Sequence, residues 1–237
     1  MATLRTQMRS KLSKTTRLAV ASTLVAVLVG ATALADVAVY ENNFSSRAKV
    51  KDVKKSGGKA CARKFVHKGN RRSMRATVKK GPKTCPFRPP VQADGELGDF
   101  ELRLDGKIAK STKKSVRKGA FLAVSVRVGG GGVGYELRVF PHTGKFKLSR
   151  GPDGGGFPVN GTSNAIAGIG RKNTLRLSTV GARVRAVVNG SEVADIADDD
   201  PGAVSGRKLR FAVGGERSSS KPVVGTLKKV RVAVPDP

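Results

Sequence analysis

Acidic side chains could do chemistry in this chain, because two facing carboxylates about 5–9.5 Å apart would allow glycoside hydrolysis. Glu136 is the one acid that the sequence pattern places on the polar face of a strand, with Arg127, Arg138 and Lys147 nearby in the sequence. Opposite charges on neighbouring strands pair readily. We therefore expect Glu136 to form an ion pair or contact a ligand. Catalysis would require a second carboxylate, such as Glu101, on the same face.

Metal and cofactor chemistry has little support in the sequence. The acidic run Asp198–Asp200 could form a calcium loop, since hard cations prefer clustered oxygens, but the Pro201-Gly202 pair that follows favours a solvated turn. His67 and His142 lie far apart and lack neighbouring ligand types, and two cysteines are too few for a cysteine-only zinc site. The glycine-rich stretches lack the ending of a phosphate-binding loop. We expect no metal and no cofactor.

The first 35 residues have the layout of a secretory signal peptide. An uncharged stretch over residues 18–35 ends on the small-x-small motif Ala33-Leu34-Ala35. Five basic residues precede this stretch: Arg5, Arg9, Lys11, Lys14 and Arg17. We expect a signal peptide over 1–35 and a secreted, extracellular chain over 36–237. The alternative is an uncleaved anchor that leaves the chain facing outside, because about 18 apolar residues barely span a bilayer.

Export of the chain bears on whether the two cysteines are oxidised. Cys61 and Cys85 are the only pair in the chain, and an oxidising compartment favours joining them. We expect a disulfide between them, with two free thiols as the alternative. Many basic residues surround this pair, so the mature chain is predicted to be one domain whose N-terminal portion, about residues 47–90, is basic and disulfide-linked.

Positive charge dominates the composition. The 237 residues include 46 Lys+Arg against 17 Asp+Glu, a formal net charge of +29. Removing the first 35 residues leaves +24, and residues 36–90 carry 16 of the basic residues against three acids. Such a surface suits an anionic polymer outside the cell, although a solvated basic face is an open alternative. Nucleic acid is not expected, because Trp is absent and aromatic residues make up only 5%.

The elements that must position these side chains are strands. Short alternating runs recur between Gly, Pro, Asn and Asp, and Asn189-Gly190 is a strong hairpin signal. We expect an all-β antiparallel sandwich or barrel. The predicted strands are Phe100–Leu104, Ala120–Val128, Tyr135–Phe140, Lys145–Ser149, Thr174–Val180, Ala182–Asn189, Glu192–Ile196, Lys208–Val213 and Val223–Val234.

Within these runs, apolar residues form one row and Arg or Lys residues form the other. In one strand, for example, Tyr135, Leu137 and Val139 share a face while Glu136 and Arg138 share the opposite one. The polar rows supply the candidate ligand contacts, which are Arg127, Glu136, Arg138, Lys147 and Arg185.

The order of several segments resembles the concanavalin A-like lectin/glucanase superfamily, in its LamG-like and 3-keto-disaccharide hydrolase (domain of unknown function 1080) form. The segments are the opening Glu41–Ser46, the unit Gly134–Val139, the strand Asn173–Leu177, the hairpin Ala182–Gly190 and the closing strand Gly225–Val234. Together they span about residues 40–235. The resemblance implies a two-sheet antiparallel jelly roll with one concave sheet, whose outer face is the site in members that bind or cut glycans.

The chain lacks the Glu-x-Asp-x-x-Glu strand of related glucanases and the closely spaced Asp and Asn of lectin calcium loops. We therefore expect a non-catalytic binding module for carbohydrate or an anionic polysaccharide or cell-wall polymer. A glycoside-acting hydrolase of the 3-keto-disaccharide hydrolase type is the alternative, and a structural envelope protein is a further one.

Overall fold

The alternating sequence pattern folds into strands, as expected for an all-β chain. The computed structural model describes residues 37–79, 81–91, 99–129, 134–151, 159–200 and 206–234. The predicted signal segment, residues 1–35, lies outside them. Among the described residues, no helix has the length and apolar character needed to cross a membrane.

One sheet has eight strands. Its order is β13-β12-β11-β6-β15-β4-β3, with β1 pairing alongside β15, and all of these pairings are antiparallel. The bounds are β1 Val37–Asn42, β3 Cys61–Lys68, β4 Arg71–Val78, β6 Phe100–Ile108, β11 Asn173–Val180, β12 Arg183–Val188, β13 Ser191–Ala197 and β15 Val223–Val234.

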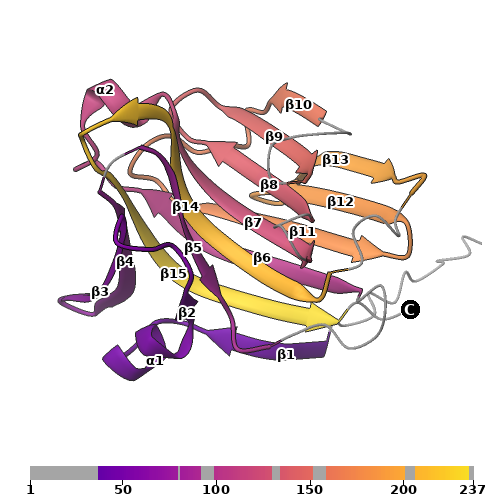
Figure 1. Cartoon of the computed structure of the whole chain (residues 1–237), viewed down its shortest axis with the longest axis horizontal. Helices are drawn as coiled ribbons and strands as arrows, with labels where there is room; N and C mark the ends of the chain where they lie inside the picture. Colours follow the sequence, from indigo (N-terminus) through magenta and orange to yellow (C-terminus); the bar gives the residue numbers. More distant parts are fainter. Residues whose placement is uncertain are drawn as a thin grey trace, which may run out of the picture. The chain divides into compact units, whose positions relative to one another are not determined.

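The second sheet has seven strands in the antiparallel order β10-β9-β8-β7-β14-β5-β2. Their bounds are β2 Lys54–Lys55, β5 Gly81–Arg88, β7 Ala120–Val128, β8 Tyr135–Phe140, β9 Lys145–Arg150, β10 Val159–Thr162 and β14 Lys208–Ser219. Two short helices, α1 Arg47–Asp52 and α2 Lys114–Arg117, complete the described elements (Figure 1).

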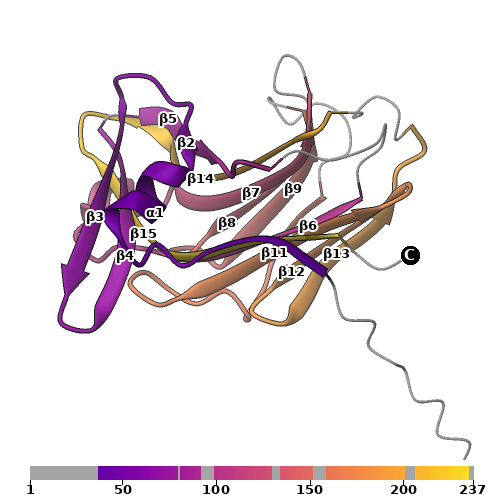
Figure 2. The same ribbon diagram turned by 90° about the horizontal axis from the view of Figure 1, so that it is seen from below.

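The two sheets stack as a sandwich, and Figure 2 shows strands such as β7 and β14 bowed so that the outer face of the seven-stranded sheet is concave. The inner rows form the core, in which Leu137 and Phe211 from one sheet and Leu102, Leu177 and Val232 from the other are fully buried. Burial of such side chains is the main source of stability in a fold of this size. The predicted two-sheet antiparallel sandwich is therefore confirmed.

The turns follow the sequence signals closely. Asn189 and Gly190 both have positive φ, 52° and 88°, as a tight hairpin between β12 and β13 requires. Gly181 and Gly144 also have positive φ, between β11 and β12 and between β8 and β9. The hairpin predicted at Asn189-Gly190 is confirmed.

The predicted disulfide is present. Cys61 on β3 and Cys85 on β5 are joined, with their Cα atoms 5.1 Å apart. Because β3 belongs to the eight-stranded sheet and β5 to the seven-stranded one, the bond connects the two layers. The basic N-terminal portion, in which the sequence pattern predicted no strand, is thus built into both sheets by β2, β3, β4 and β5.

Candidate functional site

The strand register places a row of polar side chains across the concave face. Ser149 on β9 lies opposite Glu136 on β8, which lies opposite Ser125 on β7, and Ser125 is paired with Arg210 on β14. The β14–β5 register, with Phe211 opposite Phe87, continues this row to Arg88. The row therefore joins residues from five adjacent strands.

Glu136 is held by two neighbours on this face. The Ser125 hydroxyl donates to Glu136 Oε2 at 3.1 Å, and Arg138 Nε donates to Glu136 Oε1 at 2.5 Å. Arg138 also reaches Glu216, with 3.3 Å between Nη1 and Oε1. The guanidinium of Arg138 lies 4.9 Å from the centroid of the Phe121 ring, a cation–π contact. The ion pair expected for Glu136 thus forms with Arg138.

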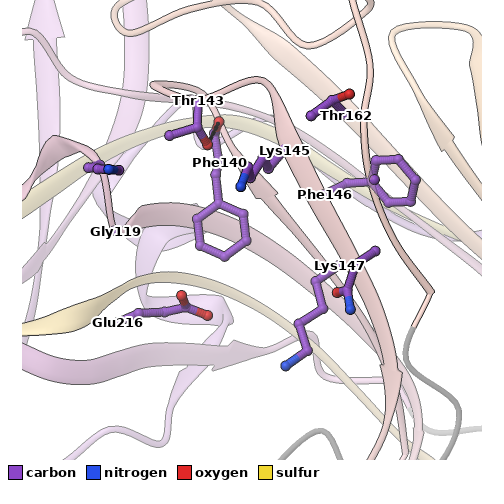
Figure 3. A pocket seen from close by; sticks show the side chains of 11 residues that line it. Gly119, Phe140, Thr143, Lys145, Phe146, Lys147, Thr162 and Glu216 are labelled. Atoms are coloured by element: carbon purple, nitrogen blue, oxygen red, sulfur yellow. Dashed lines mark hydrogen bonds between the residues drawn. The ribbon is translucent and has the colours of Figure 1, made fainter.

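A groove of about 670 Å³ lies at one end of the concave face. Phe140, Lys145 and Lys147 line it from β8 and β9, and Glu216 from β14 (Figure 3). The remaining lining residues are Lys118, Gly119, Thr143, Phe146, Asn160, Gly161 and Thr162. Phe140 belongs to a small cluster of buried apolar side chains with Phe121 and two alanines. The groove therefore offers mainly ammonium, amide and hydroxyl groups.

A smaller cavity of about 170 Å³ lies along the polar row. Ser125, Glu136, Arg138 and Arg210 line it, together with Thr84, Pro86, Val128, Gly134, Gly151 and Ala212. The two spaces are neighbours on the concave face, because Arg138 lines the cavity and contacts Glu216, which lines the groove.

Arg210, which the sequence pattern did not single out as a ligand contact, lines this cavity, and Arg88 lies opposite it on β5. The Nε atoms of Arg88 and Arg210 are buried and have no hydrogen-bond partner among the described residues. Burial, together with the positive charge of Arg88, lowers the pKa of Arg210 against the opposing effect of Glu136. Alternation placed Arg210 on a polar row, but nothing in the local sequence pairs it with a residue 122 positions earlier.

Of the five predicted contacts, the structure brings Glu136, Arg138 and Lys147 together on the concave face. The expectation that Arg127 shares their row is wrong. The β7–β14 register steps by three residues on β7 and two on β14, which is a β-bulge, and Arg127 has a φ of 50° there. Its side chain is 1% exposed and donates to Asp99 Oδ1 at 2.9 Å and to the Gly181 carbonyl at 2.7 Å.

Arg185 and Glu101 also lie elsewhere, on the outer face of the eight-stranded sheet. Arg185 Nε donates to Glu192 Oε2 at 2.6 Å, and Glu101 accepts from Arg176. Glu101 is therefore not a catalytic partner for Glu136. On this face Arg183 is likewise paired with Asp195, so these three arginines each have an acidic neighbour.

The acidic run is directed inward in part. Asp198 is buried and accepts from the Tyr135 hydroxyl, from Arg150 Nη1 at 2.8 Å and from the Asp200 amide at 3.0 Å. Burial alone would raise the pKa of Asp198, but these donors lower it overall. No group of three or more His, Cys, Asp or Glu side chains that could hold a metal ion occurs in the described ranges.

No protein-family model and no curated protein sequence matches the chain. Several solved structures share its fold. The carbohydrate-binding module CBM66 from Bacillus subtilis is 14% identical, with a TM-score of 0.54 over 77% of this chain and 95% of that one. The β-glucanase of Bacillus licheniformis is 13% identical, with a TM-score of 0.54 over 82% and 97%.

The apo form of Crh5 transglycosylase is 12% identical, with a TM-score of 0.59 over 84% of this chain and 85% of that one. A Bacillus subtilis protein of unknown function described as galectin-like is 11% identical, with a TM-score of 0.57 over 84% and 96%. Identities this low establish the fold alone. The chain has the galectin-like, concanavalin A-like jelly roll that its sequence resembles.

Proposed function

We propose that this chain is an exported, non-catalytic binding module that takes carbohydrate or an anionic cell-surface polymer on the concave face of its seven-stranded sheet. The observation that carries the proposal is the pair of neighbouring spaces on this face, one lined by Lys145 and Lys147 and the other by Arg210. The structures with the same fold include a carbohydrate-binding module and enzymes of glycan chemistry, which supports a carbohydrate-related role in general.

The chemistry of the groove suits a charged or hydroxyl-rich chain more than a neutral sugar alone. Lys145 and Lys147 have no acidic partner among the described residues, so their ammonium groups are available to a ligand. Phe140 lines the groove but is only 8% exposed, so aromatic stacking on a sugar ring would contribute little. Binding would then depend on charge-assisted hydrogen bonds, and it should weaken as salt is added.

Location outside the cell is part of the proposal. The disulfide between Cys61 and Cys85 suits an oxidising compartment. The predicted signal peptide over residues 1–35 would take the chain there. Intact-mass measurement tests this. A secreted protein whose mass corresponds to a chain beginning at Asp36 would support cleavage, whereas a membrane-retained full-length chain would contradict cleavage and favour the anchor.

An array of neutral glycans and anionic polymers, read at two salt concentrations, tests the binding role. The double variant Lys145→Gln/Lys147→Gln should lose most binding. The matched control Lys107→Gln/Lys228→Gln removes the same charge from strands β6 and β15 of the other sheet and should bind like the parent protein. Equal loss in both variants would contradict a site on the concave face, and binding to no probe would favour a structural envelope role.

A hydrolase of the 3-keto-disaccharide hydrolase type is the second candidate, because Glu136 and Glu216 both contact Arg138 on the concave face. Two carboxylates at one guanidinium could in principle act on a sugar between them. Release of sugar product by the parent protein, abolished in Glu136→Gln, would support this candidate. Binding that persists in Glu136→Gln without any product release supports the module.

A further inference from the structure

We infer that Arg88 and Arg210 together bind the carboxylate of an acidic sugar, so that the ligand of the concave face is a uronate-containing polysaccharide. This inference rests on the proposed binding function and specifies its ligand. Three features carry it: the adjacency of Arg88 to Arg210, which lines the small cavity, their unsatisfied Nε donors in the described part of the chain, and the excess of guanidinium groups over the one carboxylate among the residues that line the cavity.

Adjacency follows from the register. Phe211 lies opposite Phe87 and Ala212 opposite Pro86, so Arg210 on β14 lies opposite Arg88 on β5. Opposed residues have Cβ atoms about 4.5–5.5 Å apart and extend from the same face of the sheet. Lys54 on β2 is paired with Arg88 and adds a third positive charge to the row. Like charges placed directly opposite repel each other, so this arrangement calls for an anion.

A carboxylate could accept hydrogen bonds from the unsatisfied N–H donors of Arg88 and Arg210. Both Nε atoms are buried and lack a partner among the described residues, although a guanidinium has five N–H donors in a planar fork. That fork matches the two oxygens of a carboxylate in a bidentate pair. On the opposite sheet, by contrast, Arg183 already has such a pair, with Nε and Nη2 at 2.7 Å and 2.5 Å from Asp195.

Glu136 neutralises only part of the positive charge around the cavity. Its Oε1 accepts from Arg138 and its Oε2 from Ser125, and its charge also favours the protonated form of Arg210. Among the residues that line the cavity, this one acid faces Arg138 and Arg210, and Arg88 lies beside Arg210, so excess positive charge is left for a ligand.

The volume of the cavity suits a single anionic group. Its volume of about 170 Å³ is below the ~300–1,000 Å³ of pockets that enclose a whole small ligand. The neighbouring groove of about 670 Å³ has room for further sugars, and it lies next to the cavity because Arg138 of the cavity contacts Glu216 of the groove. A polymer with a carboxylate on its sugar ring fits this combination of a small cationic cavity and a larger polar groove.

The probe pair is polygalacturonate and its fully methyl-esterified form, which share a backbone and differ in free carboxylates. The mature protein, at about 0.15 M salt, should bind the acid at least tenfold tighter than the ester. Arg210→Gln should bring this ratio close to one, and Arg88→Gln should reduce it. The control Arg183→Gln removes the same charge from the other sheet and should leave the ratio unchanged.

The outcomes separate the inference from the proposed function. An equal affinity of the parent protein for acid and ester, or a ratio unchanged in Arg210→Gln, would overturn the carboxylate assignment while binding itself persists. Binding only to inorganic polyphosphate, lost in Arg210→Gln, would also overturn it, in favour of a phosphate ligand. Arg210→Lys keeps the charge but not the planar fork of N–H donors. If this variant shows less than half of the parent's acid-to-ester affinity ratio, bidentate recognition is supported. Thermal unfolding verifies that each variant is folded.

Discussion

Replacing Asp198 by Asn should destabilise the fold strongly, because this carboxylate joins the two sheets. It follows the last residue of β13 in the eight-stranded sheet and accepts from Tyr135 on β8 and Arg150 on β9 in the other. Its side chain is 2% exposed. An amide at this position keeps the size but removes the charge, and it places N–H groups where donors already converge.

The magnitude follows from the contacts. A hydrogen bond to a charged group contributes roughly 1.5–3 kcal/mol, and the quarter-exposed side chain of Arg150 lowers its share through solvent screening. We expect Asp198→Asn to lower the free energy of unfolding by about 2–3 kcal/mol. For a chain of this length that corresponds to a fall in Tm of roughly 4–12 °C. Tyr135→Phe removes one of the hydrogen bonds to the same buried carboxylate and should cost about 1.5–3 kcal/mol.

The difference between parent and Asp198→Asn should depend on pH with a defined sign. The pKa of Asp198 is lowered in the folded state, so its contribution is complete above the unfolded value of about 3.9 and is lost as pH falls below it. Burial and the contact with Asp198 raise the pKa of Tyr135, so its contribution is complete below about pH 10 and is lost above it. The difference should be constant between about pH 5 and 9.

Circular dichroism of urea unfolding suits this measurement, because the chain has no Trp to report by fluorescence. A loss under about 0.5 kcal/mol at pH 7, or a difference that is the same at pH 7 and pH 3, would refute the reasoning. Either result would mean that water, and not Asp198, satisfies Tyr135 and Arg150.

Three further changes test other parts of the structure. Arg210→Met removes a half-buried cation with an unsatisfied donor and should raise stability by about 1 kcal/mol; a drop in Tm would contradict the unpaired charge. Reduction of Cys61–Cys85, which are 24 residues apart, should cost about 3 kcal/mol, seen as a lower urea midpoint in dithiothreitol. Gly214→Val should cost about 1–3 kcal/mol, because any Cβ would meet the Phe121 ring at 2.1 Å; an unchanged Tm would contradict that packing.

Much of the sandwich could be predicted from local pattern. Alternation identified the strand at Tyr135–Phe140 and assigned its two faces as the structure has them, because each of those residues lies in a regular ladder. The hairpin at Asn189-Gly190 follows from backbone conformations that these residue types tolerate. Both features depend on interactions between residues that are close in sequence.

Other features depend on interactions that no local pattern carries. One extra residue in β7 rotates Arg127 away from its expected row, and alternation gives no sign of it. In β3, Arg63 interrupts the row of Cys61 and Phe65, and no strand was predicted there. β4 is an exception, because Met74, Ala76 and Val78 alternate with Arg75 and Thr77, so this strand could have been predicted from local pattern. The pairing of Arg88 with Arg210 requires knowing that β5 lies beside β14, which only the complete strand order provides.

Arginines lie opposite one another on both outer faces, and the two faces differ in the acids beside them. On the eight-stranded sheet, Arg103 lies opposite Arg176, but Asp105 is 3.5 Å from Arg103 and Glu101 accepts from Arg176, an arrangement that a sheet can keep for solubility and modest stability alone. On the concave sheet, Arg88 and Arg210 lie opposite each other with buried donors unsatisfied, which costs stability in the free protein. A ligand that accepts hydrogen bonds from this pair best explains why the fold keeps two arginines that destabilise the free protein. If Arg210→Met both raises the free energy of unfolding and loses binding of the acidic polymer, both parts of this explanation are supported.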